Sequence, residues 1–120
     1  MSVTAPRTNY VISVQLTALP NWLALERRAR AAVIAEHAEP ILQARPEVRV
    51  RWIDAEAFTA ECSDLLLAET EDLRDWNHLF EALRDTPLFA EPYFALDRIV
   101  VGIEDGYRDY EQALLNPPTR

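Results

Sequence analysis

The chain has 120 residues, 49% of them hydrophobic and 27% charged, which is the composition of one folded domain. Its net charge of −8 argues against nucleic acid and against an anionic membrane surface as partners, because both select clustered positive charge. All 12 basic residues are arginines and only 2 residues are glycine, which excludes a Schiff-base lysine, a P-loop lysine and a Gly-rich phosphate loop. We therefore expect no nucleotide cofactor and no other cofactor.

Cysteine content and hydropathy limit the remaining classes. Cys62 is the single cysteine, so no internal disulfide forms, and with two histidines it does not complete a zinc site without carboxylates. No stretch reaches the roughly 18 consecutive apolar residues that a membrane span needs, and residues 1–9 lack the apolar core of a signal peptide. We expect no metal, no membrane association and a cytoplasmic location.

The first half of the chain predicts a strand, a long helix and a second strand. Residues 10–19 alternate between an apolar and a mixed face, the period of a strand. Residues 22–44 repeat apolar side chains at helical spacing. Pro40 lacks an N–H, so the helix should bend or restart there. Residues 47–54 alternate again and predict the second strand.

The second half predicts a third strand, a second helix and a fourth strand. Residues 63–70 contain four consecutive apolar residues and leave no polar face. A helix then opens at Thr70 or Asp72, both good N-caps, and runs to about Arg84. Residues 94–104 form the fourth strand, apolar on both sides at its centre. A tail with apolar residues at helical spacing follows.

The order β-α-β-β-α-β indicates an α+β, ferredoxin-like fold, with a four-stranded antiparallel sheet and two helices on one face. We expect residues 10–115 to form this single domain, between flexible ends at residues 1–9 and 116–120. Since the third and fourth strands are apolar on both sides, the uncovered face would expose a larger apolar patch than monomers usually show. Two sheets packed face to face about a two-fold axis would remove it, so the sequence predicts a homodimer.

Five separated blocks carry a family resemblance: Tyr10–Leu23, Arg51–Phe58, Cys62–Asp64, Leu83–Phe89 and Gly102–Tyr107. In this order they resemble the darcynin family of small bacterial proteins, over nearly the whole length from Tyr10 to Glu111. That family has no assigned activity, so the resemblance implies no reaction for this chain. By architecture the chain resembles the dimeric α+β barrel proteins, which implies a small organic ligand between sheet and helices; this is an analogy of fold.

The two histidines are the candidates for acid–base work. His37 has Val33 and Ile41 one turn on either side, so its ring is expected to point toward the sheet and could act as a general base near neutral pH. The alternative is a core histidine that is hydrogen-bonded to a carbonyl or carboxylate. His78 lies off the apolar stripe of its helix, which fits either solvent exposure or the rim of a pocket.

Polar residues predicted to share the mixed face of the sheet form a second candidate group: Ser13, Gln15, Arg49, Arg51, Arg98 and Glu104. Converging arginines could hold a carboxylate or enolate and stabilise developing negative charge. Alternatively, they form salt bridges across a dimer interface or protect an edge strand. A register shift of one residue would move the whole group to the other face. The aromatic residues Trp22, Trp52 and Trp76, together with Tyr10 and Phe80, line either an aromatic pocket or the core.

We therefore expect a homodimeric, cofactor-independent protein that binds or transforms a small organic molecule. If it is an enzyme, isomerisation, cyclisation or dehydration fits best, with His37 as base and Arg51 as anion stabiliser. The alternatives are a non-catalytic protein-interaction module and a cofactor-free monooxygenase. An enclosed cavity of roughly 300 Å³ or more, reached by a histidine or arginine, would favour the small molecule. A solid core with an exposed apolar groove would favour a protein partner.

Overall fold

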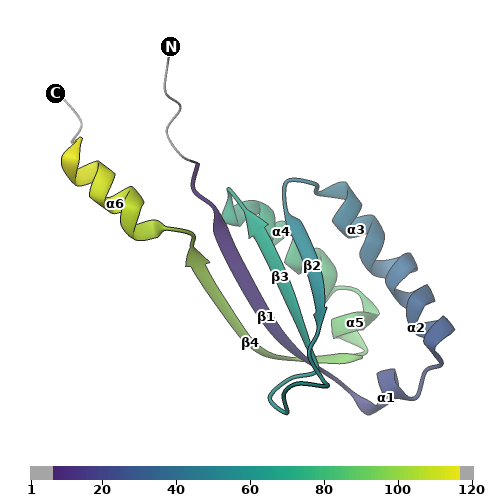
Figure 1. Ribbon diagram of the computed structural model, residues 1–120. Coiled ribbons are helices and arrows are strands. Elements are labelled where there is room, and N and C mark those ends of the chain that lie inside the picture. Colours follow the sequence, from purple (N-terminus) through teal and green to yellow (C-terminus); the bar gives the residue numbers. More distant parts are fainter. Residues whose placement is uncertain (1–6, 117–120) are drawn as a thin grey trace.

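Helices cover one face of a four-stranded antiparallel sheet in the computed structural model, which describes residues 7–116 (Figure 1). The strands are β1 (Tyr10–Ala18), β2 (Arg49–Asp54), β3 (Asp64–Thr70) and β4 (Phe94–Ile103), in the spatial order β2-β3-β1-β4. This is the ferredoxin-like arrangement, and the predicted fold class is confirmed. The flexible ends that we expected lie mostly outside the described residues.

The register of the strands separates a helix-covered face from an open face. On β1, Ile12, Val14 and Leu16 are fully buried beneath the helices. The alternate residues of the sheet point to the open face, and they include Val11, Ser13 and Gln15 of β1, Arg49, Arg51 and Ile53 of β2, Leu65 and Leu67 of β3, and Arg98 and Val100 of β4. The open face is therefore mixed, with a central apolar strip and arginines on both edge strands.

The connection from β1 to β2 consists of four short helical pieces: α1 (Pro20–Leu23), α2 (Arg27–Val33), the π-helix η1 (Ile34–Ala38) and α3 (Glu39–Ala44). The prediction of one helix from residue 22 was wrong at its start, because the chain leaves helical geometry between α1 and α2. The Arg30 guanidinium donates to the carbonyl oxygens of Trp22 and Leu23, which takes up acceptors that a continuous helix would need. Glu26 is extended, with ψ of 154°, and starts α2.

Pro40 shapes the second half of this connection. A proline has no N–H and its ring crowds the carbonyl four residues earlier. The structure accommodates it with a wider turn just upstream, in which the Glu39 N–H bonds to the Ile34 carbonyl, five residues back. The helix therefore adjusts before Pro40 and α3 starts with the proline in its first turn.

The connection from β3 to β4 holds the main packing helix, α4 (Leu73–Arg84), and the short α5 (Pro87–Ala90). Asp72 caps α4, as predicted, because its carboxylate accepts from the Arg74 N–H at 2.8 Å. The buried stripe of α4 is Trp76, Leu79, Phe80 and Leu83. This stripe forms one cluster with the buried residues of β1 and β3, so the core lies between α4 and the centre of the sheet.

A last helix, α6 (Gly106–Leu115), follows β4 and points away from the sheet (Figure 1). The described part of the molecule is accordingly elongated, with extents of 61 × 31 × 23 Å. Within residues 7–116, no helix is both long and apolar enough to cross a membrane.

Candidate functional site

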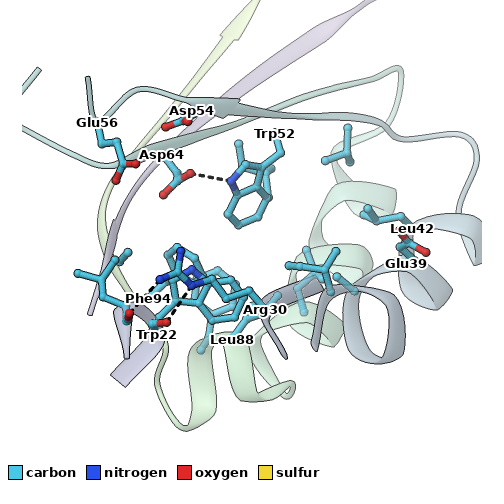
Figure 2. Close-up of a pocket in the computed structure, with 18 of the residues that line it drawn as sticks. Trp22, Arg30, Glu39, Leu42, Trp52, Asp54, Glu56, Asp64, Leu88 and Phe94 are labelled. Carbon is cyan, nitrogen blue, oxygen red and sulfur yellow. Dashed lines mark hydrogen bonds between the residues drawn. The ribbon is translucent and has the colours of Figure 1, made fainter. Parts of the chain in front are cut away.

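A cavity of about 570 Å³ lies on the helix-covered side of β2, between this edge strand and the helical pieces α1 to α3 (Figure 2). Its walls come from segments distant in the sequence, including Trp22 of α1, Leu42 of α3, Trp52 of β2 and Leu88 of α5. The cavity is open to solvent, and one of its lining residues, Leu23, is exposed. The cavity has the size of sites that hold a small organic molecule.

Aromatic side chains form much of the wall. The Phe94 ring contacts Trp22 at a centroid distance of 5.0 Å and Trp52 at 5.5 Å, the second pair edge to face. Trp52 points to the helix side of the sheet and lines the cavity, yet it is 39% exposed. A tryptophan on the core side of a sheet normally buries most of its surface. The exposed indole is therefore apolar surface available to a ligand.

Three carboxylates stand at one end of the cavity, from Asp54, Glu56 and Asp64 (Figure 2). Asp54 and Asp64 lie opposite each other on β2 and β3. Asp64 is fixed by two donors, the Trp52 Nε1–H at 2.8 Å and the Ser63 hydroxyl at 2.7 Å. These oxygens can accept hydrogen bonds from a ligand or face a positive charge. Within the described range, no group of three potential ligand side chains has metal-site geometry.

Two arginines border the cavity on the helix side. Arg30 holds α1 against α2 through its bonds to the carbonyls of Trp22 and Leu23, at 3.2 and 2.9 Å. These two hydrogen bonds give Arg30 a structural role, since they hold α1, which carries Trp22 of the cavity wall. Arg27 is exposed at the rim and makes no ion pair with the residues that the structure describes.

The cavity exists because α2, η1 and α3 do not pack closely against the sheet. From Arg27 to Ala44, the only fully buried side chain is Ala38. Apolar residues that face the cavity, such as Ile34, Leu42 and Val50, are only half-buried. In a close-packed interior such side chains would interlock. The gap over β2 is thus an apolar space that the protein's own side chains do not fill.

The structure places the predicted helix-side residues in three different surroundings. Trp52 lines the cavity, as the pocket hypothesis requires. Trp76 is buried in the core and stacks on Phe80 at 4.9 Å, the alternative given above for it. His37 sits on η1, with its Nε2 3.9 Å from the Glu36 carboxylate, and His78 lies on the exposed side of α4. Neither histidine borders the cavity.

The predicted open-face group does share one face, but its arginines do not converge. Arg51 is on edge strand β2 and Arg98 on the opposite edge strand β4, with two strands between them. Three strand spacings separate them by about 14 Å. Ser13 and Gln15 lie on β1 between these edges. Because His37 belongs to the helix layer, one ligand bound to a single chain does not reach both His37 and Arg51.

Glu104 takes part in a polar network at one end of the open face. Asn9 donates from its Nδ2 to Glu69 at 2.9 Å and to Glu104 at 3.0 Å, while Arg49 donates to the Asn9 Oδ1 at 3.1 Å. The network spans all four strands. The Arg49 charge faces the Glu69 carboxylate of the same chain at 3.9 Å, so Arg49 contributes to this network rather than standing free for a bound anion.

Sequence reasoning did not identify the cavity residues Asp54, Asp64 and Arg30. One signal was present: Asp54 is two residues after Trp52, so strand alternation places both on the same face. The pairing of Asp64 with Asp54 required the register. Arg30 was hidden in a run of arginines, and only its contacts with α1 distinguish it.

Solved structures of known proteins share this fold. An arginine-to-lysine mutant of chlorite dismutase from Candidatus Nitrospira defluvii superimposes with a TM-score of 0.69 at 24% identity, over 84% of this chain and 42% of that chain. The same enzyme in complex with imidazole gives 0.68 at 15% identity, over 79% of this chain. The present chain spans about two fifths of the length of these dismutases. At these identities the similarity shows the fold alone.

Sequence comparison gives the family. The family model described as darcynin, a domain of unknown function, matches residues 2–116. Darcynin of Chromobacterium violaceum is 51% identical over 76 residues, which cover 63% of this chain and 96% of the relative. Darcynin 1 of Acinetobacter baumannii is 43% identical over 89 residues, covering 74% of this chain and 99% of the relative. The resemblance noted in the sequence is confirmed, and the chain belongs to the darcynin family.

Proposed function

We propose that this protein binds a small, largely aromatic organic molecule in the cavity over β2. The observation that carries the proposal is the unfilled apolar space of about 570 Å³ beside the half-exposed Trp52. Pockets for small organic ligands are typically about 300 to 1,000 Å³ and combine apolar walls with a few polar groups. This cavity exceeds the size set above for a small-molecule ligand and is bordered by Arg30, but it is open to solvent rather than enclosed.

The polar groups favour a ligand with a positively charged or hydrogen-bond-donating end. Asp54, Glu56 and Asp64 can accept bonds from an amine at one end of the cavity, while Trp22 and Trp52 offer ring faces to an aromatic body. A cation over a tryptophan face contributes about 0.5–2 kcal/mol. If the protein transforms its ligand, these carboxylates are the groups within reach, and the proposal of His37 as base loses geometric support.

The binding proposal is tested by isothermal titration calorimetry with three probes of equal ring system: tryptamine, which is cationic, neutral indole, and anionic indole-3-acetate. We expect tryptamine to bind most tightly and indole-3-acetate least. Leu42→Trp should abolish binding, because it places a large ring in the cavity.

The matched control for the cavity-filling variant is Leu73→Trp, which places the same ring on α4, outside the cavity. This variant should bind as the unaltered protein does. Equal binding of tryptamine by Leu42→Trp and Leu73→Trp, or no heat of binding with any probe, would contradict the proposal that this cavity binds the ligand.

We also propose that the chain works as a homodimer in which the open sheet faces pack together. The support is the apolar strip on that face, formed by Val11, Leu65, Leu67 and Val100, with Val100 55% exposed. Burying one such face against its two-fold copy removes the strip from water. Leu67→Arg should then weaken self-association in sedimentation velocity, whereas a monomeric wild-type protein at micromolar concentration would contradict the dimer.

A further inference from the structure

The C-terminal helix α6 presents an apolar stripe that the rest of the described chain, residues 7–116, leaves exposed. Tyr107, Tyr110 and Leu114 recur at helical spacing and are 60%, 65% and 61% exposed. Figure 1 shows α6 beyond the end of β4, away from the sheet and from the other helices. Isolated helices shorter than about 12–15 residues are marginal in water, so a ten-residue helix needs a packing partner.

A matching bare surface runs along β4. Ile99, Val101 and Ile103 point to the helix side of the sheet, as Ile12 and Val14 of β1 do, yet they are 40%, 46% and 50% exposed. The cause is the position of the helices, since α4 and α5 cover the centre of the sheet and leave this edge strand open (Figure 1). Each chain thus carries two exposed apolar surfaces. One is the stripe on α6, and the other is the strip on β4, which α4 and α5 leave exposed.

The two surfaces also match in length. From Ile99 to Ile103 the strand rises about 13 Å, and the ten residues of α6 span about 15 Å. If the six side chains of the stripe and the strip are fully covered, roughly 650 Å² per chain leaves water, or about 1,300 Å² for two copies, which lies within the range of specific protein interfaces.

The junction between β4 and α6 holds the helix away from its own strip. Glu104 follows β4 and is held to the chain beside it, because its N–H donates to the Asn9 carbonyl at 2.8 Å and its carboxylate accepts from Asn9. The turn comprises Glu104 and Asp105, and Asp105 adopts the left-handed conformation with φ of 51°. The Arg108 N–H bonds to the Asp105 carbonyl and fixes the helix start. A reversal of α6 onto its own β4 would require these contacts to break.

From these observations we infer that α6 is an exchanged helix: in the homodimer, the α6 of each copy packs its stripe on the β4 strip of the other. The inference rests on the proposed homodimer and adds a specific surface to it. The second copy is the fitting occupant because each chain holds both halves of the contact, so a two-fold axis satisfies them in pairs. A short, conformationally restricted hinge such as Asp105 is the usual setting for exchange of a terminal element.

The test compares full-length variants by sedimentation velocity from 0.1 to 100 μM. One double variant, Tyr110→Glu with Leu114→Glu, alters the stripe on α6. A second double variant, Ile99→Glu with Val101→Glu, alters the strip on β4. All four side chains are exposed in the single chain, so each variant should keep the circular dichroism and thermal unfolding of a folded monomer. We expect each variant to raise the dimer dissociation constant at least 100-fold. Gln112→Glu, on the opposite side of α6, is the control and should leave it within about twofold.

A disulfide cross-linking experiment shows whether the contact between stripe and strip joins two chains. Leu114→Cys and Val101→Cys are made in separate chains on a Cys62→Ser background, mixed, and oxidised. A disulfide between the two different chains supports the exchange. A dimer that both glutamate variants leave intact overturns the exchange but not the sheet-face dimer, and a monomeric wild-type protein overturns both. Since binding of tryptamine is measured separately, neither result depends on the cavity.

Discussion

The two halves of the helix layer differ in what they do with their apolar side chains. Helix α4 buries Trp76, Leu79, Phe80 and Leu83 against the centre of the sheet. The stretch from α2 to α3 is longer, yet it fully buries only Ala38 and leaves a cavity over β2. One half thus supplies most of the buried apolar side chains, and the other leaves a space that we propose a ligand fills. The cavity borders the core, since Leu66, Leu83 and Leu88 belong to the buried cluster and also line the cavity.

The largest effect should come from removing core volume under α4. Leu79 is fully buried, so Leu79→Ala should lower the free energy of unfolding by about 3 kcal/mol, the sum of lost burial and the cavity left behind. Leu42→Ala, on the cavity side, should cost less than about 1 kcal/mol because Leu42 is already half-exposed. Urea denaturation followed by circular dichroism measures both, and equal losses would contradict the comparison.

A smaller effect is expected at Arg30, which belongs to the cavity wall. Arg30→Met keeps the aliphatic stem and removes both bonds to the α1 carbonyls, so stability should fall by about 1 kcal/mol, after allowance for the partial exposure of the side chain. Affinity for tryptamine should fall together with stability, because α1 carries Trp22. Arg28→Met, two positions away on the exposed surface, is the matched control.

Helix capping should also distinguish the two halves of the helix layer, with a difference in stability of similar size. Asp72→Ala removes the side-chain bond that starts α4 and should cost about 1 kcal/mol. Glu26 precedes α2 without a side-chain cap bond, so Glu26→Ala should change stability by less than about 0.5 kcal/mol. Chemical denaturation of the two variants in parallel decides this, and a larger loss at Glu26 would mean that α2 is anchored more firmly than its contacts indicate.

The smallest effect is expected at His37. Because this side chain does not border the cavity, His37→Gln should leave the tryptamine dissociation constant within about twofold. Asp54→Asn is the informative comparison, since it removes a charge at the cavity end and should weaken tryptamine more than neutral indole. If His37→Gln abolishes binding while the fold is kept, the site lies elsewhere in the helix layer.

The strands could be predicted to within about two residues, because alternation along the chain is a local signal: residues 10–19 were expected and Tyr10–Ala18 is found. The break between α1 and α2 could not, since it depends on Arg30 reaching carbonyls seven and eight residues earlier. Of the aromatic residues predicted to line a pocket, Trp22 and Trp52 line the cavity, whereas none of the predicted histidines and sheet-face arginines does. An unfilled space between elements leaves no periodic pattern, and its carboxylates come together only through the pairing of β2 with β3.

The three tryptophans give the most direct test of the cavity as a ligand site. Trp22 and Trp52 line it, while Trp76 lies in the core beside Phe80 and serves as an internal reference. In a ¹H–¹⁵N correlation spectrum of the full-length protein titrated with tryptamine, the indole N–H signals of Trp22 and Trp52 should shift and saturate together, while that of Trp76 stays in place. Movement of Trp76 alone, or of none of the three, would contradict the account.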